Sequence, residues 1–121
     1  MTVAFDFSGQ VAVVTGSCGA LGSAVTEAFA EAGATVAACD VVPIDNEDSQ
    51  LDPADGIEFY QADFTDESAV AETVDRIVAD HGRIDHLLNI AGTWRGGDPV
   101  EETDVDQFDM LFDVNLKTMF L

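Results

Sequence analysis

Residues 11–29, VAVVTGSCGALGSAVTEAF, decide the fold of this chain. A β-branched, apolar run gives way to a turn that carries Gly16, Gly19 and Gly22, after which apolar residues resume at helical spacing. Backbone N–H groups at the start of a helix are unpaired and lie at the positive end of its dipole, so they stabilise an anion. Glycines let that anion approach the backbone closely. The stretch therefore predicts a strand, an anion-binding turn and a helix.

Short apolar or β-branched runs predict further strands along the chain. The four expected strands occupy residues 10–15, 35–39, 57–62 and 84–91. Between the second and third, residues 45–56 are polar, acidic and rich in turn formers, so we expect a loop there. The same loop holds five carboxylates, but Gly56 stands where an EF-hand requires its closing glutamate, so a calcium site is not expected.

Three helices are expected around these strands. The first ends at Gly33 and shows apolar residues at helical spacing, namely Leu21, Val25, Ala28, Phe29 and Ala32. The second begins after Thr65 as N-cap and ends at Gly82, and its inner face is expected to carry Val70, Val74, Ile77 and Val78. The third follows a glycine-rich loop, and Thr103 with Asp106 resembles a capping pair at its start. Its apolar stripe comprises Val105, Phe108, Leu111, Phe112, Leu116 and Met119.

Strands that alternate with helices are joined by right-handed crossovers into a parallel sheet. The sequence therefore predicts an α/β fold, a Rossmann-type doubly wound parallel sheet, as a single domain over residues 1–121. The chain closes on DVNLKTMFL without a helix stop signal, so we expect a sheet truncated after the helix that follows strand four. Strand four would then be an open sheet edge, and the stripe of the last helix would lack a cover.

The charge balance excludes several partners. Twenty-four acidic residues face four basic ones, giving a net charge of −20, which repels nucleic acid and anionic lipid. Lys117 is the only lysine, and this depletion favours a protein adapted to a salty, halophilic cytoplasm. No apolar run is long enough for a membrane span, and the N-terminus has no signal-peptide pattern, so a cytoplasmic location is expected.

Asp40 stands at the end of the second strand, opposite the glycine turn in a βαβ unit. In a dinucleotide site, a carboxylate at this place accepts hydrogen bonds from the adenosine ribose hydroxyls and repels a 2′-phosphate. No arginine or lysine occurs in the turn or just after Asp40. The residues therefore predict NAD as cofactor, in preference to NADP.

Four motifs, in this order, resemble those of the classical short-chain dehydrogenase/reductase family: TGSCGALG (15–22), ADFTD (62–66), LNIAG (88–92) and VNLK (114–117). The resemblance implies hydride transfer between NAD and an alcohol or carbonyl carbon. It implies that Asn115 belongs to the catalytic set, holding a water in a proton relay. It also implies a cofactor site at Thr15, Gly16, Ser17, Cys18, Ala20, Leu21, Gly22, Asp40, Asp63, Phe64, Asn89, Ala91 and Gly92, in which Thr15 and Asn89 tie neighbouring strand ends together.

Two departures from the family pattern matter. The turn also fits the extended branch of epimerases and dehydratases, whereas NIAG and VNLK favour the classical branch. The family's catalytic serine and Y-x-x-x-K would lie beyond Asn115, and the only tyrosine here, Tyr60, sits in the third strand. We therefore expect the N-terminal half of an oxidoreductase that is inactive alone and that forms a homo-oligomer through its last helix. The alternative is a non-catalytic nucleotide-binding or oligomerising module.

The remaining candidate ligands predict no metal site. Cys18 and Cys39 match no zinc spacing and are interpreted as buried, reduced thiols. His81 and His86 are single and lack a partner pattern, so structural roles are expected, His81 at a helix C-terminus where a cationic imidazole is favourable.

Overall fold

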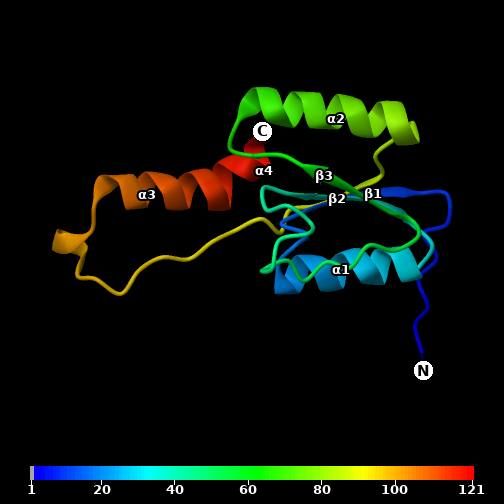
Figure 1. Cartoon of the computed structure of the whole chain (residues 1–121), viewed down its shortest axis with the longest axis horizontal. Helices are drawn as coiled ribbons and strands as arrows, with labels where there is room; N and C mark the ends of the chain where they lie inside the picture. Colours follow the sequence, from blue (N-terminus) through cyan, green and yellow to red (C-terminus); the bar gives the residue numbers. More distant parts are fainter. Residues whose placement is uncertain (1) are drawn as a thin grey trace.

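The computed structural model describes residues 2–121 and contains one four-stranded parallel sheet (Figure 1). The strands lie in the order β3-β2-β1-β4. Their bounds are Val11–Thr15 for β1, Thr35–Asp40 for β2, Ile57–Gln61 for β3 and His86–Leu88 for β4. The doubly wound, Rossmann-type parallel sheet is thereby confirmed.

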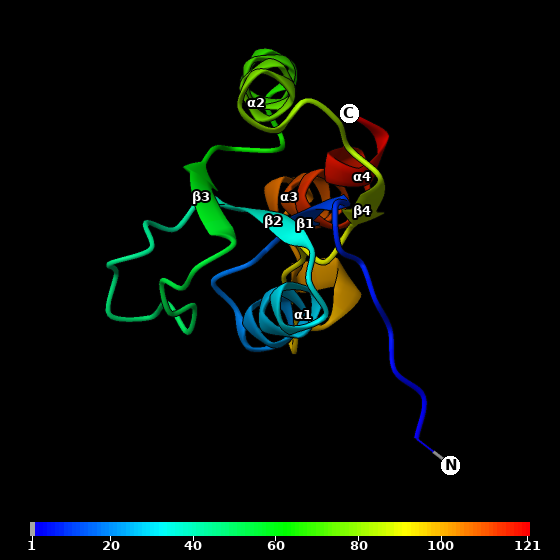
Figure 2. The same ribbon diagram turned by 90° about the vertical axis from the view of Figure 1, so that its right-hand side faces the viewer.

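Two long helices cover opposite faces of this sheet, as Figures 1 and 2 show. The helix α1 spans Ala20–Glu31 on one face, and α2 spans Glu67–His81 on the other. The remaining helical segments follow β4: η1 at Val100–Glu102, α3 at Val105–Phe112, the π-helical η2 at Asp113–Lys117 and α4 at Thr118–Phe120. The single continuous last helix that the sequence predicts is therefore divided by a π-helical stretch.

The core lies on both sides of β1 and β2, because alternate residues of a strand face opposite sides of the sheet. Towards α2, Val13, Cys39 and Tyr60 pack with Ile77. Towards α1, the buried residues are Val14, Ala34 and Val36, with Phe7, Val25 and Phe29 partly buried against them. Every residue of β1 is buried, as a central strand with helices on both faces requires.

The edge strand β4 is shorter than the sequence predicts. Residues 84–91 were expected to be extended, but only His86–Leu88 pair with β1. Beyond these pairs, one backbone bond and two side-chain bonds hold the flanking residues: the Asp85 N–H donates to the Val11 carbonyl over 2.8 Å, the Val11 N–H donates to Asp85 Oδ2 over 2.8 Å, and the Ile90 N–H donates to Thr15 Oγ1 over 3.1 Å. The backbone leaves the regular ladder at both ends because these contacts provide its hydrogen bonds.

The predicted helix caps at Thr65 and Thr103 are wrong. Asp66 is the N-cap of α2, and its carboxylate accepts from the Ser68 and Ala69 N–H groups. Asp104 is the N-cap position of α3, without a side-chain cap bond, and the Thr103 hydroxyl donates to the Pro99 carbonyl. In both segments an aspartate stands one residue after the expected threonine, and a local pattern does not distinguish the two.

The inner helix faces also differ in part from the expectation. In α1 the buried residues are Gly22, Ser23 and Thr26, whereas Leu21 is 65% exposed. In α2 the expected Val70 and Ile77 are buried together with Thr73, but the other two expected residues are exposed, Val74 by 39% and Val78 by 44%. Small residues replace large ones on α1 because its first turn packs directly against the backbone of the glycine turn.

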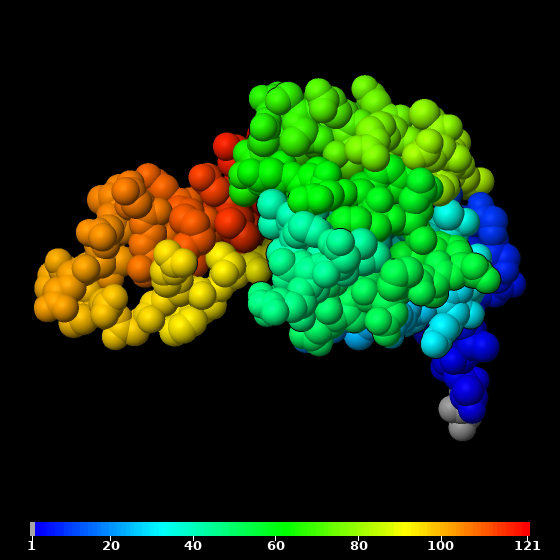
Figure 3. All heavy atoms as spheres, in the orientation of Figure 1, coloured from blue at the N-terminus to red at the C-terminus, as the bar shows by residue number. Residues whose placement is uncertain are grey.

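The segment after β4 protrudes from the body of the molecule as far as α3, whereas its C-terminal end lies against the sheet and α2 (Figure 3). Its apolar stripe is exposed, as expected: Phe108, Phe112 and Leu116 each expose more than half of their surface. The chain from the C-terminal end of β4 to α3 forms an extended arm in Figure 1. Among residues 2–121, no helix is both long enough and apolar enough to traverse a bilayer.

Candidate functional site

Gly16 and Gly22 bring two backbone segments into contact at the start of α1. Gly16 has a φ of +65°, which glycine adopts without strain, and a Cβ there would lie 2.8 Å from the Ala91 backbone. A Cβ on Gly22 would lie 1.9 Å from the Gly16 carbonyl oxygen. Gly19, the N-cap of α1, has far more room, with the Gly16 oxygen at 3.6 Å as its only near neighbour. Two of the three glycines are thus required by packing.

A cleft of about 670 Å³ opens over this turn at the carboxyl ends of β1, β2 and β4. Its floor is the turn itself and the first turn of α1, whose N-cap makes no side-chain cap bond. The predicted residues that line it are Gly16, Cys18, Ala20, Leu21, Gly22, Asp40, Ala91 and Gly92. Uncapped N–H groups at a helix start, approached through glycine, are suited to a phosphate group.

Asp40, at the end of β2, holds the turn in place by direct hydrogen bonds. Its Oδ2 accepts from the Cys18 N–H over 2.9 Å, and its Oδ1 accepts from the Val42 N–H over 3.0 Å. Each carboxylate oxygen has a further lone pair, so the group remains able to accept from a ligand hydroxyl. Asp40 therefore positions the backbone and also presents negative charge to the cleft.

Thr15 fastens the ends of β1 and β4 together, as the sequence predicts. Its buried hydroxyl accepts from the Ile90 and Ala91 N–H groups, each over 3.1 Å. The side chain does not line the large cleft. Its contact instead fixes the backbone at Ala91, against which Gly16 packs.

Ser17 and Cys18 turn their side chains towards the protein. The Ser17 hydroxyl is buried and donates to the Cys39 carbonyl over 3.1 Å. Cys18 Sγ lies 3.6 Å from the Val42 carbonyl oxygen, and Leu51 packs in the same buried cluster. Burial raises the pKa of the Cys39 thiol to about 12, so this thiol stays protonated. Both cysteines are buried and free, as predicted.

Asp63 and Phe64 line a smaller hollow of about 90 Å³ that shares Gly16 and Asp40 with the large cleft. Asp63 Oδ1 accepts from the Thr65 N–H over 2.9 Å, which orients the carboxylate. Phe64 packs against the core cluster beneath α2. The two residues thus extend the cleft towards β3.

Asn89 faces away from the cleft. It lines a separate apolar hollow with Val13, Phe64 and Ile77, between the sheet, α2 and the C-terminal segment. Thr15 alone makes the strand-end contact that the sequence assigns jointly to Thr15 and Asn89.

Asn115 lies within the π-helical stretch, and its side chain forms hydrogen bonds to the loop after β4. Its Oδ1 accepts from the Thr93 N–H over 3.0 Å, and its Nδ2 donates to the Thr93 carbonyl over 2.9 Å and to the Leu111 carbonyl over 2.8 Å. Oδ1 also lies 2.9 Å from the Cβ position of Gly92, so a larger residue there would displace the amide. In this structure the Asn115 side chain is committed to backbone partners.

Sequence reasoning left eight of the residues that line the cleft out of the predicted site: Gly19, Val41, Val42, Asp48, Ile90, Thr93, Met110 and Val114. Asp48 lies in a loop with many carboxylates, and no local signal distinguishes it from its neighbours. Met110 and Val114 fall between the positions of the predicted stripe, so they face the cleft while the stripe faces solvent.

Comparison with known proteins is consistent with this geometry. A family model described as short chain dehydrogenase matches residues 10–121. The chain belongs to the short-chain dehydrogenase family. It is 37% identical over 116 residues to 3-oxoacyl-(acyl-carrier-protein) reductase FabG of Thermotoga maritima, covering 93% of this chain and 46% of that protein. It is 36% identical to D-threitol dehydrogenase of Mycolicibacterium smegmatis, covering 100% of this chain and 48% of that enzyme. The chain spans about half the length of these curated relatives.

Solved structures of family members superpose on the chain. A 3-ketoacyl-(acyl-carrier-protein) reductase from Brucella melitensis, complexed with NADH, matches with a TM-score of 0.85 at 26% identity, over 96% of this chain and 48% of that one. An NAD⁺-bound xylitol dehydrogenase matches with a TM-score of 0.82 at 32% identity, over 94% of this chain and 45% of that one.

Proposed function

We propose that the cleft binds NAD and that the protein to which this chain belongs is an NAD-dependent oxidoreductase acting on an alcohol or carbonyl substrate. The observation that carries the proposal is the uncapped start of α1, which lies at the glycine turn and lines the cleft together with Asp40. When bound, the nicotinamide supplies the hydride donor or acceptor. Two family members with matching folds are complexes with NADH or NAD⁺, which supports the choice.

The residues of the cleft fit a dinucleotide in two respects. Gly16 and Gly22 let the turn pack tightly against neighbouring backbone, and Gly19, whose Cβ position has no neighbour closer than 3.6 Å, leaves the α1 N-terminus accessible to a pyrophosphate. Asp40 lines the same cleft at the end of β2, where a ribose would present its hydroxyls. The α1 N–H groups would hold the pyrophosphate, Asp40 the adenosine ribose, and Asp63 with Phe64 would border the adenine.

Charge in the cleft favours NAD over NADP. Asp40 and Asp48 both line it, and its lining includes no lysine or arginine among the described residues. A 2′-phosphate would bring further negative charge next to these carboxylates without a cationic partner. We therefore expect NAD to bind at least about tenfold more tightly than NADP, or roughly 1.4 kcal/mol.

These 121 residues alone are proposed to bind nucleotide without turning over an alcohol. Tyr60, the only tyrosine, is buried beneath α2, where its hydroxyl donates to Asp80 over 2.7 Å. Burial raises the pKa of Tyr60, so this phenol stays protonated and is unsuited to exchange protons with a substrate in the cleft. In the whole protein, Asn115 is proposed as a positioning residue. Its side chain would act by holding the Thr93 backbone, which borders the cleft.

Calorimetric titration of the chain with NAD, NADP and ADP-ribose tests the proposal. We expect weak binding of NAD, about 0.1 to 1 mM, with ADP-ribose nearly equal because the adenosine half of the site makes most contacts. Asp48→Asn removes a negative charge from the cleft without altering the turn, so it should reduce the preference for NAD over NADP. Asp40→Asn should reduce this preference too and should also lower the affinity for both dinucleotides. Equal or tighter binding of NADP by the unaltered chain would refute the cofactor assignment.

A second proposal concerns self-association through the last helical segment. Phe108 and Phe112 are in contact, with ring centroids 4.6 Å apart, and both are more than half exposed. Exposed apolar stripes of this kind mark association surfaces. In sedimentation velocity, Phe112→Ser should weaken a dimer, whereas Val100→Ser, which alters an exposed apolar residue off the stripe, should not. A strictly monomeric chain at about 0.1 mM would exclude self-association as the role of this surface.

A further inference from the structure

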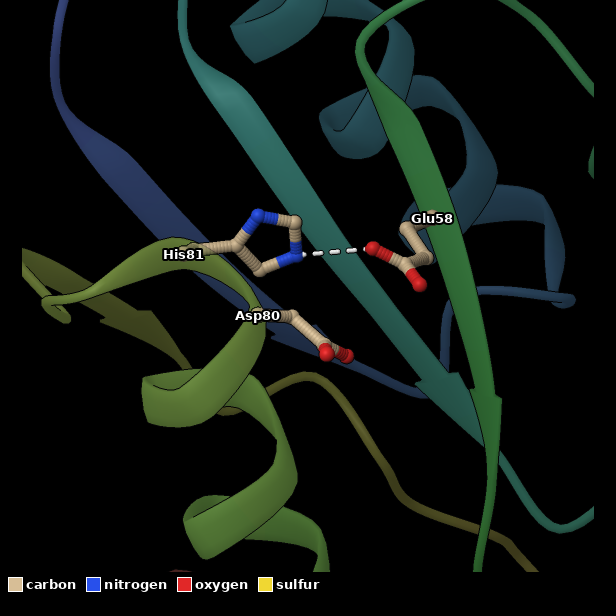
Figure 4. Close-up of side chains that lie close together, drawn as sticks. All are labelled: Glu58, Asp80 and His81. Atoms are coloured by element: carbon tan, nitrogen blue, oxygen red, sulfur yellow. Dashed lines mark ion pairs between the residues drawn. The ribbon is translucent and has the colours of Figure 1, made fainter.

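Three side chains with metal-binding atoms converge on the face of the sheet opposite α1, away from the cleft. Glu58 extends from β3, and Asp80 and His81 come from the last turn of α2 (Figure 4). One ligand atom from each lies within 4.8 Å of the other two. Among residues 2–121, no other three histidine, cysteine or acidic side chains converge in this way.

The backbone on both sides of this group is well defined. Glu58 pairs in register with Ala37 of β2. Gly82, with a φ of +83°, ends α2 directly after His81, and its N–H donates to the Val78 carbonyl over 2.8 Å. The side chain of His81 is 13% exposed, so solvent reaches it while packing restricts its rotation.

Hydrogen bonds already orient the three groups towards one point. His81 Nε2 lies 2.9 Å from Glu58 Oε2 and 3.0 Å from the Tyr60 hydroxyl. That hydroxyl donates to Asp80 Oδ2 over 2.7 Å. Tyr60 is 1% exposed, so its position is fixed by the core rather than by solvent. Through these two contacts, Tyr60 restricts the positions of Asp80 and His81.

We propose that Glu58, Asp80 and His81 bind a divalent transition-metal ion, with Zn²⁺ as the best fit. Tetrahedral ligands about 2.1 Å from zinc stand roughly 3.4 Å apart, so small side-chain rotations convert the present separations into a coordination shell. In the bound state His81 would be a neutral imidazole with its ring proton on Nδ1, so that the Nε2 lone pair binds the ion, and the two carboxylates would balance the charge of the ion. Tyr60 keeps its hydrogen bond to Asp80 and orients that ligand.

The imidazole distinguishes this group from the acidic surface around it. Carboxylates alone suit Mg²⁺ and Ca²⁺, whereas a nitrogen ligand shifts preference towards zinc, nickel and copper. The guanidinium of Arg76 lies 5.2 Å from the centre of the Tyr60 ring and is the nearby positive charge that opposes a cation. Zinc would join β3 to the end of α2 and so stabilise the folded chain.

The test is titration of the 121-residue chain, freed of metal with EDTA, with ZnCl₂, MgCl₂ and CaCl₂ in about 0.5 M KCl. This salt screens the general attraction of cations to a strongly acidic protein. We expect one equivalent of zinc to bind and to raise the thermal midpoint, and EDTA to reverse the rise. Neither magnesium nor calcium should compete at a hundredfold excess. Equal competition by calcium would overturn the proposal.

His81→Gln is the decisive variant, and His86→Gln is its matched control. His86, the other histidine, contacts Gln10 and Phe7 on the opposite side of the sheet. We expect His81→Gln to weaken zinc binding about 10- to 100-fold or more, as loss of a direct ligand requires, and His86→Gln to leave it unchanged. A His81→Gln chain that has a lower midpoint but an unaltered response to zinc would show that His81 only joins β3 to α2. That result would refute the metal site.

Discussion

The inner strands and the edge strand β4 are held in the sheet by different forces. β1 pairs with β2 over five residues, and all five residues of β1 are buried. β4 pairs with β1 over three residues, and Leu87 in its middle is 55% exposed. Asp85 and Thr15 then hold its two ends through hydrogen bonds to backbone N–H groups. Burial positions the inner strands, whereas individual side chains position the edge.

The difference matters for the candidate site, which lies where the two regions meet. Gly16 belongs to the densely packed inner region, and Ala91 belongs to the segment after the edge strand. The hydrogen bond from the Ala91 N–H to Thr15 Oγ1 helps to keep their backbones in contact. The cleft therefore depends on both kinds of stabilisation, and substitutions in each region should separate their contributions.

The largest effect is expected for Gly22→Ala in the inner region. The added Cβ would lie 1.9 Å from the Gly16 carbonyl oxygen, so the turn must open. We expect a loss of at least about 3 kcal/mol in the free energy of unfolding, measured in urea, and loss of nucleotide binding. Gly19→Ala has its nearest neighbour at 3.6 Å and should cost about 1 kcal/mol or less. Equal costs for the two would mean that the glycine turn is not tightly packed.

A paired comparison across the sheet should show the next largest effect. Val13 and Leu87 are register partners, with Val13 4% and Leu87 55% exposed. Val13→Ala should cost about 2 kcal/mol. Leu87→Ala should cost less than about 1 kcal/mol although it removes more atoms. If Leu87→Ala proved the more costly in chemical unfolding, the edge strand would be buried in solution, and the contrast between the regions would fail.

Thr15→Val tests the hydrogen bonds that hold the C-terminal end of β4. It keeps the shape of the side chain but leaves the Ile90 and Ala91 N–H groups without their acceptor. We expect a loss of about 1 to 2 kcal/mol and faster hydrogen exchange at these two amides. Thr15→Ser retains the hydroxyl and serves as control. Unchanged exchange in Thr15→Val would show that β4 needs no such attachment.

Asp85, which holds the N-terminal end of β4 through its hydrogen bond from the Val11 N–H, should make this contact sensitive to acid. Hydrogen bonds from Arg83 and from the Val11 N–H lower the pKa of Asp85 below its ordinary value of about 3.9. Because the folded-state pKa is the lower one, its contribution to stability is complete above the ordinary value and is lost as the pH falls through the lowered one. Thermal midpoints between about pH 6 and pH 2 should therefore fall less steeply in Asp85→Asn. If the thermal midpoints of the two chains changed with pH in parallel, Asp85 would make no net contribution to the stability of the fold.

Sequence patterns predicted the inner region better than the edge. Apolar runs located β1, β2 and β3 to within about one residue, because burial on both faces requires such runs. The same reasoning extended strand four to residues 84–91, since a run of apolar residues does not reveal where pairing stops. The predicted caps at Thr65 and Thr103 each fell one residue before the observed N-cap positions, Asp66 and Asp104, because threonine and aspartate are alternative capping residues.

The sequence by itself determined the parallel sheet, the glycine turn and the place of Asp40, because each follows from residues close together in the chain or from their periodic spacing. Only the tertiary structure decided that Asp48 joins the cleft, that Asn115 grips Thr93, and that Asn89 faces the other side. It also brought Glu58 to the end of α2, beside His81. The physical reason is that these contacts join segments far apart in sequence, and side-chain directions at such meetings are set by packing, which no local pattern encodes.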